Sequence, residues 1–453
     1  MEPIYLKDVI RWSKGIIEGK YRDDFLIKGI SIDSRRIKPK ELFIALKGEK
    51  FDGHDFVKKS FEKDACGAIV RKNFILPDLN NKFIIKVEDT LNTLGDIARN
   101  YRKMFKIKVI GITGSDGKTT TKEIIKKILS SKYYVIGTEG NLNNEIGLPL
   151  TLLNINKKHN ICVCEMGMNK KGEIEYLSKI LSPSIGIITN IGYAHIGFFK
   201  NLKEIAESKS ELLKNLTGEK LAILNYDSPF FLFLKKYALS KVITFGLKNG
   251  ADFQGVIEEI ENDKFSFSIK GIKEKFYMNF WNPSWFYSGV IGIILGKKFG
   301  ISLKETKNIL ESFKPLKGRG KVYKFKDIEI IDETYNSNPF SLKNSLYYFS
   351  QKNAKRKIAI IGDMAELGKY CFYYHFKIGK FLNDIPIDII LTFGEKSKSI
   401  SYGMKDKKRI KNFFEISQLH KFLKKNLQKG DLILIKGSRI MGMERIIDLI
   451  KET

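Results

Sequence analysis

The sequence predicts an α/β protein of three domains, with a central domain built on a parallel sheet and a Rossmann-like domain at the C-terminus. Two observations support this fold class. A chain of 453 residues is too long for one hydrophobic core, and about three domains is the natural expectation for that length. Short apolar segments also alternate with helical ones along most of the chain, which is typical of parallel sheets covered by helices.

The composition is that of an ordinary globular protein, with 43% hydrophobic and 29% charged residues. The chain opens without an apolar signal segment, and no stretch approaches the roughly 18 apolar residues of a membrane span. The four cysteines, Cys66, Cys162, Cys164 and Cys371, lack metal-ligand spacing. These features predict a protein of the reducing cytoplasm that is not integral to a membrane.

The net charge of +29 raises the question of a nucleic-acid partner. Of the 80 basic residues, 68 are lysines and 12 are arginines, and they are spread along the whole chain. No recognition helix, aromatic RNA-binding motif or zinc finger accompanies them. We therefore expect no nucleic-acid partner. The sequence is silent on oligomeric state, and we expect a monomer.

Residues 1–88 alternate short strands and helices and are predicted to form the first domain. Ser34, Arg35 and Lys47 could hold phosphates there, because arginine offers a planar fork and lysine a point charge. The same residues could equally be ordinary surface side chains. Residues 90–105 carry apolar side chains at helical spacing and predict a helix that leads into the glycine-rich phosphate-binding loop.

Residues 107–123 contain a phosphate-binding loop, in which an apolar strand, a turn with three glycines and a helix follow one another. Such glycines let successive backbone N–H groups point at one anion, and the helix N-terminus adds positive charge. Lys118 would reach the outer phosphates of a nucleoside triphosphate, and the Thr119 hydroxyl would bind Mg²⁺. The predicted nucleotide contacts are Gly114, Ser115, Asp116, Gly117, Lys118, Thr119 and Thr120.

Further polar residues follow the ends of apolar strands in this central part. Glu165 ends the strand 161–165, where ligands lie in a parallel sheet, and it is placed to face Mg²⁺. His195 comes shortly after the next strand and is a candidate for function for the same reason. Lys209, taken alone, would pass as a solvated lysine. The stretch 140–149 is too rich in Asn and Gly for a strand and predicts a polar loop.

A proline and two glycines at 314–320 mark a domain junction, so that the second and third domains are predicted at residues 89–316 and 317–453. The last domain again alternates strands and helices, as in a Rossmann-like parallel sheet. Three of its strand ends carry polar residues, at 332–339, 362–368 and 436–439.

Taken in order, nine such motifs resemble the Mur ligases, which build the peptide of peptidoglycan precursors. The stretches 141–147, 362–368 and 436–439 are most similar to the members that join D-Ala-D-Ala to a UDP-N-acetylmuramoyl-tripeptide. The resemblance implies a UDP-sugar domain, a central P-loop ATPase and a C-terminal domain that closes over the nucleotide. It also implies an ATP-dependent amide ligase working through an acyl phosphate.

The resemblance implies specific roles for the residues that match. Thr119 and Glu165 would bind one Mg²⁺, and His195 with a carbamylated Lys209 would bind a second. Lys118, His195 and Lys209 would be the catalytic residues, and Arg319 and Asp332 would meet ATP when the last domain closes. The implied substrate contacts are Ser34, Arg35, Lys47, Asn141, Asn143, Asn144, Asn336, Lys436 and Arg439.

Three other functional interpretations remain open. The preceding Mur ligase, which adds the third amino acid, shares the ATPase core but normally lacks the stretches 141–147 and 436–439 as written here. Folylpolyglutamate synthase has no counterpart of residues 1–88. A P-loop motor, transporter or nucleic-acid ATPase would need a translocation partner or nucleic-acid module that the sequence does not display. The third residue of the acceptor peptide cannot be predicted.

One departure from the family pattern concerns adenine. Most members carry a His-Asn pair before an Ala-rich helix, whereas this chain has Ser284-Trp285 there and Ser288 at a second Asn position. Asn282 survives three positions early and could still present an amide. Trp281 and Trp285 either fill the core or offer an indole that stacks on adenine.

Overall fold

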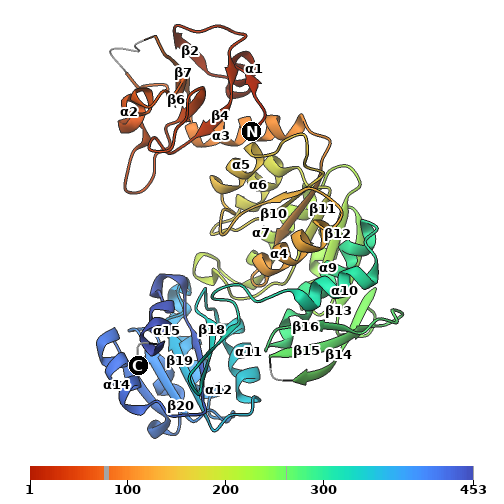
Figure 1. Cartoon of the computed structure of the whole chain (residues 1–453), viewed down its shortest axis with the longest axis vertical. Helices are drawn as coiled ribbons and strands as arrows, with labels where there is room; N and C mark the ends of the chain where they lie inside the picture. Colours follow the sequence, from red (N-terminus) through yellow and green to blue (C-terminus); the bar gives the residue numbers. More distant parts are fainter. Residues whose placement is uncertain (76–80, 262, 452–453) are drawn as a thin grey trace.

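The computed structural model describes residues 1–75, 81–261 and 263–451. It has a five-stranded sheet in the N-terminal part, a nine-stranded sheet in the middle and a six-stranded sheet at the C-terminal end, together with a small two-stranded ribbon. The three large sheets follow one another along an arc from the red to the blue end of the chain (Figure 1). The predicted α/β class is confirmed.

The N-terminal sheet has the order β2-β7-β6-β5-β4, in which only β2 runs antiparallel to its neighbour. Its core is made by fully buried residues such as Leu42, Ile69 and Ile85. The strands of the sheet are β2 (Ile16–Gly19), β4 (Gly29–Ser31), β5 (Glu41–Ile44), β6 (Gly67–Arg71) and β7 (Phe83–Val87). The two-stranded ribbon and helices of this part are β1 (Ile4–Tyr5), β3 (Leu26–Ile27), α1 (Leu6–Ser13) and α2 (Val57–Glu62).

Helix α3 (Thr90–Lys103) connects the N-terminal part to the central part, close to the predicted range of 90–105. The Asp89 side chain accepts a hydrogen bond from Asn92 N and begins the helix. Tyr101 is fully buried, accepts a hydrogen bond from Glu2 N at 2.7 Å and donates one to Ile155 O at 2.6 Å. One side chain therefore ties the chain start, α3 and the central part together.

The central sheet has the order β16-β15-β14-β13-β12-β11-β8-β10-β9. It is parallel from β9 to β14, and β14, β15 and β16 are antiparallel to one another. The strands are β8 (Lys108–Thr113), β9 (Val135–Gly137), β10 (Ile161–Glu165), β11 (Ile185–Ile188), β12 (Leu221–Asn225), β13 (Lys241–Gly246), β14 (Phe253–Glu261), β15 (Lys264–Ile269) and β16 (Phe276–Met278). The helices are α4 (Lys118–Leu129), α5 (Gly147–Leu153), α6 (Glu173–Leu181), α7 (Leu202–Lys214), α8 (Phe231–Tyr237), α9 (Phe286–Lys298) and α10 (Leu303–Ser312).

Two details of this region depart from the sequence prediction. The antiparallel strands at the sheet edge were not predicted. Strand β14 does not alternate buried apolar with exposed polar residues, because its apolar residues Val256 and Ile260 are 53% and 52% exposed. The predicted loop 140–149 is also shorter than expected. The Asn144 side chain accepts hydrogen bonds from Ile146 N and Gly147 N, and α5 begins at Gly147.

Helix α9 is apolar on all sides and packs on α4, the helix that follows the phosphate-binding loop. Gly292 makes this approach possible, since a Cβ there would meet Ile128 at 2.7 Å and Ile124 at 2.8 Å. Helix α9 therefore supports, through α4, the loop that precedes α4. No helix within the described ranges is both long and apolar enough to cross a membrane.

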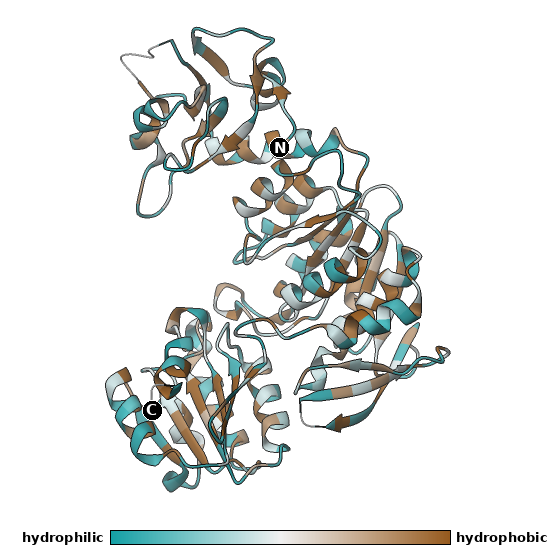
Figure 2. Ribbon diagram, viewed as in Figure 1, coloured by the Kyte–Doolittle hydropathy of each residue, from teal (hydrophilic) through white to brown (hydrophobic). Residues whose placement is uncertain are grey.

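The C-terminal sheet has the order β17-β18-β22-β19-β20-β21, with only β17 antiparallel, and confirms the Rossmann-like prediction. Its strands are apolar and lie between helices with polar outer faces (Figure 2). The strands are β17 (Lys321–Phe325), β18 (Ile328–Glu333), β19 (Arg356–Gly362), β20 (Ile389–Phe393), β21 (Ile410–Phe413) and β22 (Asp431–Lys436). The helices are α11 (Pro339–Ser350), α12 (Cys371–Phe381), α13 (Ser399–Gly403), α14 (Ile416–Asn426) and α15 (Glu444–Lys451).

Candidate active site

The phosphate-binding loop lies between β8 and α4 and is held by the neighbouring strand end. Gly114 has a φ of 150°, and a Cβ there would meet Thr189 Oγ1 at 1.8 Å, so only glycine fits. Ser115 Oγ donates a hydrogen bond to Gly192 O at 3.0 Å, and Thr189 Oγ1 donates one to Asp116 O at 2.6 Å. The loop is therefore preformed.

Lys118 lies across this loop, where its Nζ donates a hydrogen bond to Gly114 O at 2.8 Å. Burial lowers the pKa of Lys118, and the carboxylates of Glu165 and Asp116 oppose that shift. Thr119 and Thr120 follow at the start of α4, and the buried Thr120 hydroxyl has no hydrogen-bond partner within the described ranges. Backbone, lysine and hydroxyls thus converge at one helix N-terminus, which is the arrangement that binds phosphate.

Glu165 meets the loop from the end of β10 and is 2% exposed. Its Oε1 accepts a hydrogen bond from Asn143 Nδ2 at 2.5 Å, whereas its Oε2 has no partner among the residues that the structure describes. A buried carboxylate oxygen without a partner beside a threonine hydroxyl fits Mg²⁺. No group of three or more His, Cys, Asp or Glu that could hold a metal was found in the described part of the chain. A Mg²⁺ ion here would complete its coordination with phosphate oxygens and water.

Lys209 is the most unusual lysine of the site. It lies in α7 and is 1% exposed, so it is not the solvated side chain that the sequence alone allowed. Burial lowers its pKa well below the ordinary value, the charge of Lys118 acts in the same direction, and Asp116 opposes it. A lowered pKa favours the uncharged amine, which is the form of a lysine that reacts with CO₂.

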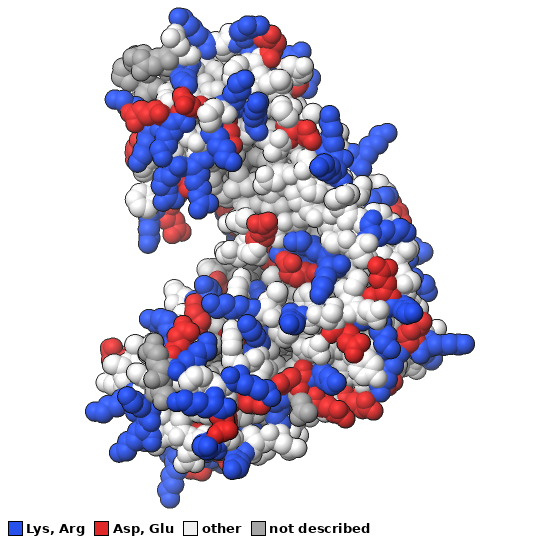
Figure 3. All heavy atoms as spheres, in the orientation of Figure 1, with Lys and Arg blue, Asp and Glu red and all other residues white. Residues whose placement is uncertain are grey.

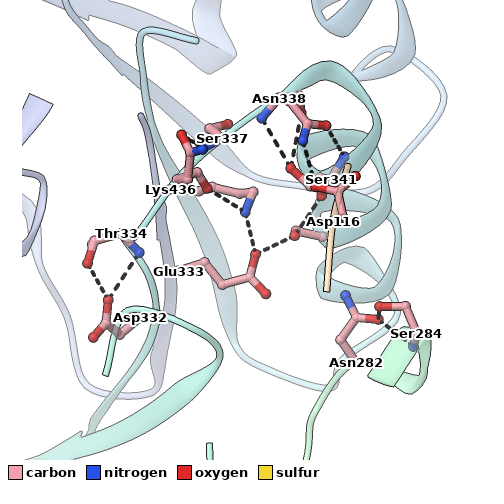
Figure 4. A network of polar contacts seen from close by, with 12 residues as sticks. Asp116, Asn282, Ser284, Asp332, Glu333, Thr334, Ser337, Asn338, Ser341 and Lys436 are labelled. Carbon is pink, nitrogen blue, oxygen red and sulfur yellow. Dashed lines mark hydrogen bonds and ion pairs between the residues drawn. The ribbon is translucent and has the colours of Figure 1, made fainter. Parts of the chain in front are cut away.

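Polar side-chain contacts join the C-terminal part to the phosphate-binding loop and to the loop after β11. Arg319 Nη2 donates a hydrogen bond to Thr119 Oγ1 at 3.0 Å, and Asn338 Nδ2 donates one to Asp116 Oδ1 at 2.6 Å. Nδ1 of His195 lies 2.8 Å from Oε2 of Glu366, in an ion pair that is not aligned as a hydrogen bond. The C-terminal part is therefore closed onto the loop, as the Asn338–Asp116 contact shows in Figure 4.

Arg319 is oriented by its own region. Its guanidinium carbon lies 3.6 Å from the centre of the Tyr335 ring, a stacking contact. Burial lowers the pKa of Arg319, which nevertheless stays a cation. Asp332 is fully buried and accepts hydrogen bonds from Gly318 N, Thr334 N and Thr334 Oγ1. Asp332 thus holds the turn that presents Arg319, and its carboxylate faces Thr334 (Figure 4).

The other residues predicted in the C-terminal part divide into two kinds. Lys436 is buried, pairs with Glu333 at 3.0 Å and donates a hydrogen bond to Asn336 O at 3.1 Å (Figure 4). Arg439 is exposed and pairs with Glu444. Lys436 therefore builds the loop around Asn336, whereas Arg439 is an exposed side chain held by Glu444.

The residues predicted in the N-terminal and connecting loops are mostly on the surface. Ser34 is buried, Arg35 pairs with Asp33 and is exposed, and Lys47 is exposed. Asn141 and Asn144 are also exposed, on the loop before α5. The molecule is hollowed between its N-terminal and C-terminal lobes, and lysines and arginines line the N-terminal rim of that hollow (Figure 3).

The stretch that departs from the family pattern lies beside the turn of Arg319. Trp281 is 1% exposed and belongs to the core, whereas Trp285 is partly exposed and packs on Phe280, with ring centres 5.0 Å apart. Neither indole nitrogen has a hydrogen-bond partner among the described residues. A Cβ on Gly320 would lie 3.1 Å from Trp281 Nε1 and 3.7 Å from Trp285 Nε1. Both donors thus converge next to Arg319.

Known proteins are similar to this chain in sequence and in fold. Residues 112–282 match the Mur ligase middle domain, residues 318–439 the Mur ligase glutamate ligase domain, and residues 26–102 the Mur ligase family catalytic domain. The UDP-N-acetylmuramoyl-tripeptide–D-alanyl-D-alanine ligase of Bacillus subtilis (strain 168) is 34% identical over 453 residues, which cover 98% of each chain. The chain belongs to the Mur ligase family.

Solved structures of Mur ligases have a similar fold. A crystal structure of MurF from Acinetobacter baumannii has a TM-score of 0.93 and 29% identity, and both chains are covered completely. The crystal structure of MurF ligase from Thermotoga maritima in complex with ADP has a TM-score of 0.84 and 28% identity, covering 94% of this chain and 97% of that one. The resemblance to the Mur ligases and the three-domain fold that it implies are thereby confirmed.

Sequence reasoning missed three residues of this Mur ligase that the structure brings to the site, namely Tyr335, Asn338 and Glu366. The stretches that contain them had been noted, because each follows a strand of the C-terminal sheet. What the sequence could not supply is their partners, since Asn338 and Asp116 are 222 residues apart. The signal that could have found them is the strand-end position itself.

Proposed function

We propose that this chain is an ATP-dependent ligase that joins D-Ala-D-Ala to UDP-N-acetylmuramoyl-tripeptide and so forms the UDP-muramoyl-pentapeptide. The observation that carries the proposal is the approach of Arg319 and Asn338 to the phosphate-binding loop, because a nucleotide bound there would lie between two regions that are far apart in sequence. The full-length similarity to ligases of that name supports the choice of substrates.

The chemistry follows from the weakness of a carboxylate as an electrophile. Phosphorylation of the tripeptide carboxylate by ATP gives an acyl phosphate, the amine of D-Ala-D-Ala attacks it, and phosphate leaves from a tetrahedral intermediate. No covalent nucleophile on the protein is required. Lys118 and Arg319 bring fixed positive charge to the transferring phosphoryl group, and the preformed loop orients it.

Two Mg²⁺ sites are part of this proposal. Thr119 and Glu165 would hold one ion, and the unpartnered Glu165 Oε2 supports this choice. His195 and Lys209 would hold the second, with Lys209 carbamylated so that an oxygen replaces a repelling ammonium. The burial and low pKa of Lys209 support its reaction with CO₂. Bound Mg²⁺ would neutralise charge on the phosphate oxygens.

We propose a separate role for each of the three domains. Residues 1–88 bind the UDP-sugar, residues 89–316 form the ATPase, and residues 317–453 close over ATP and receive D-Ala-D-Ala. Asp332 acts by holding the turn of Arg319. The proposed substrate contacts are Ser34, Arg35, Lys47, Asn141, Asn143, Asn144, Asn336, Lys436 and Arg439. We also propose that the protein works in the cytoplasm as a monomer.

The proposal is tested by phosphate release with a panel of UDP-muramoyl tripeptides that differ in their third residue. Release is expected only when ATP, one of these tripeptides and D-Ala-D-Ala are all present, and Lys118→Ala serves as the inactive control. Release with a dipeptide acceptor and a single amino acid would favour the preceding ligase. Release with a folate would favour a folylpolyglutamate synthase, and stimulation only by nucleic acid or membranes would reject a ligase altogether.

A further inference from the structure

The contact between His195 and Glu366 joins two regions through residues of unusual conformation. His195 follows β11 and has a φ of 64°, and Glu366 follows β19 and has a φ of 60°. A residue other than glycine rarely adopts this left-handed conformation, because its Cβ comes too close to the backbone. The two residues face each other across one interface, so backbone strain is concentrated where the central and C-terminal parts meet.

The backbone at this interface is docked as well. Gly197 N donates a hydrogen bond to Glu366 O at 2.7 Å. A Cβ on Gly197 would meet Gly368 N at 2.5 Å, and a Cβ on Gly368 would meet Gly197 Cα at 2.9 Å. Tyr370 Oη also donates a hydrogen bond to Lys200 O at 3.0 Å. The Glu366 side chain is therefore delivered to His195 by a fitted backbone contact.

Glu366 lies beside the same site, with its Oε2 2.8 Å from Nδ1 of His195. The His195 side chain is 20% exposed and that of Glu366 39%, so neither is closed off from solvent.

A histidine that binds a metal through one ring nitrogen typically donates the N–H of the other to a carboxylate, which fixes its orientation. Here Oε2 of Glu366 lies 2.8 Å from Nδ1 of His195, although the two groups are not aligned as a hydrogen bond, and Nε2 is left for a metal ion. We propose that Glu366 is the positioning residue of the second Mg²⁺ site and that it makes this site complete only when the C-terminal region is closed. This inference rests on the proposed role of His195 as a ligand.

The consequence is a coupling between closure and metal binding. In the open protein His195 lacks its carboxylate and binds metal weakly, whereas closure supplies Glu366 and tightens the site. The second ion is then held only when the nucleotide is already enclosed. Reciprocally, binding of that ion stabilises the closed form by the same free energy.

The test uses the full-length protein with Mn²⁺ in place of Mg²⁺ and a non-hydrolysable ATP analogue, measured by electron paramagnetic resonance. The wild type is expected to show nitrogen coupling from one histidine to Mn²⁺, and His195→Ala to lose it. Glu366→Gln keeps the size of the side chain but removes its charge, and it should weaken Mn²⁺ at this site about 10–100-fold. Glu395→Gln, an exposed carboxylate of the same region, is the control and should change nothing.

The double variant His195→Ala/Glu366→Gln should bind Mn²⁺ no more weakly than His195→Ala alone, because Glu366 acts through the histidine. An additional loss would overturn the proposal, as would Mn²⁺ affinity in Glu366→Gln that is unchanged or higher. A wild type without histidine coupling would overturn both this inference and the role of His195 as a ligand. The phosphate-release assay judges the ligase function separately from all of these outcomes.

Discussion

The two junctions of this protein are built from different chemistry. The apolar junction joins the N-terminal and central parts through α3, whose buried residues Leu94, Ile97 and Ala98 pack between them. Gly95 lets α6 approach so closely that a Cβ would meet Tyr176 Oη at 2.5 Å. The hydrogen bonds of Tyr101 complete this junction. Apolar surface of this kind cannot be re-exposed without a large cost.

The polar junction joins the central and C-terminal parts through Arg319–Thr119, Asn338–Asp116 and His195–Glu366. Each of these side chains also belongs to the proposed ATP or Mg²⁺ site or touches a residue that does. Polar groups of this kind are as well satisfied by water as by one another. From this difference we expect the first junction to be permanent and the second to depend on bound ligand.

The largest effect is expected at Lys209, a proposed ligand of the metal site beside the polar junction. Lys209→Ala should lower kcat by at least about 10³-fold, because it removes an oxygen ligand of the proposed metal site. Short-chain carboxylates added to the assay should restore part of the activity. Lys203→Ala, an exposed lysine of the same helix, is the control. Wild-type turnover of Lys209→Ala would show that this lysine has no part in the reaction.

The next largest effect concerns the apolar junction. Tyr101→Ala removes a fully buried aromatic side chain and two hydrogen bonds, and should lower the free energy of unfolding by about 3–5 kcal/mol, measured by urea titration. Tyr134→Ala, at a residue 67% exposed, should change it by less than about 0.5 kcal/mol. A loss in Tyr101→Ala no greater than in Tyr134→Ala would contradict a permanent junction at α3.

Arg319→Ala should separate activity from stability. The substitution removes positive charge from the transferring phosphoryl group, and kcat should fall about 10²–10³-fold. The urea midpoint should stay close to that of the wild type, because the polar junction contributes little without ligand. Arg445→Ala, at an exposed arginine of the same region, should leave both quantities unchanged. A lowered midpoint with intact kcat would mean that Arg319 is structural.

A smaller effect is expected at Trp285, where we expect the adenine base of ATP to lie. If an indole stacks on adenine, Trp285→Phe should raise the KM for ATP several-fold, since stacking contributes roughly 1–3 kcal/mol per base. Wild-type protein should discriminate poorly between ATP and GTP and change its fluorescence when ATP binds, as two of its three tryptophans lie here. Strict preference for ATP, an unaltered emission and an unaltered KM would leave Trp285 as a packing residue.

The smallest effect is a pH dependence of the apolar junction. Burial raises the pKa of Tyr101 from 10.0 to about 12. Between these two values the unfolded chain has lost the phenolic proton while the folded protein keeps it, so stability falls as pH rises through this window. Tyr101→Phe should flatten the decline seen in urea titrations between pH 10 and 12, and Tyr134→Phe should not. An equal decline in Tyr101→Phe would assign the pH dependence to other groups.

Much of this architecture could be predicted from local sequence, because the informative residues are neighbours in the chain. The glycines, Lys118 and Thr119 of the phosphate-binding loop lie within a few positions of one another, and Glu165 follows its strand directly. The position of a residue at a strand end is enough to place it at the ligand-binding edge of a parallel sheet.

What could not be predicted depends on long-range pairing. Arg319 and Thr119 are 200 residues apart, and nothing local in either stretch reveals the other. Asp332 carries the expected residue type at a strand end, yet its oxygens are occupied by the backbone of Gly318 and Thr334. The exposed strand β14 lacks the alternation by which a strand is recognised. Only the assembled fold supplies these facts.

The difference between the two junctions is tested most directly by hydrogen exchange of the full-length protein, with and without Mg²⁺ and a non-hydrolysable ATP analogue. The amides of α3 should be protected equally in both conditions. The amide of Gly197, which donates to Glu366 O in the closed form, should exchange readily alone and become protected when the ligands are added. Equal protection of Gly197 without ligand, or loss of protection in α3, would contradict the account.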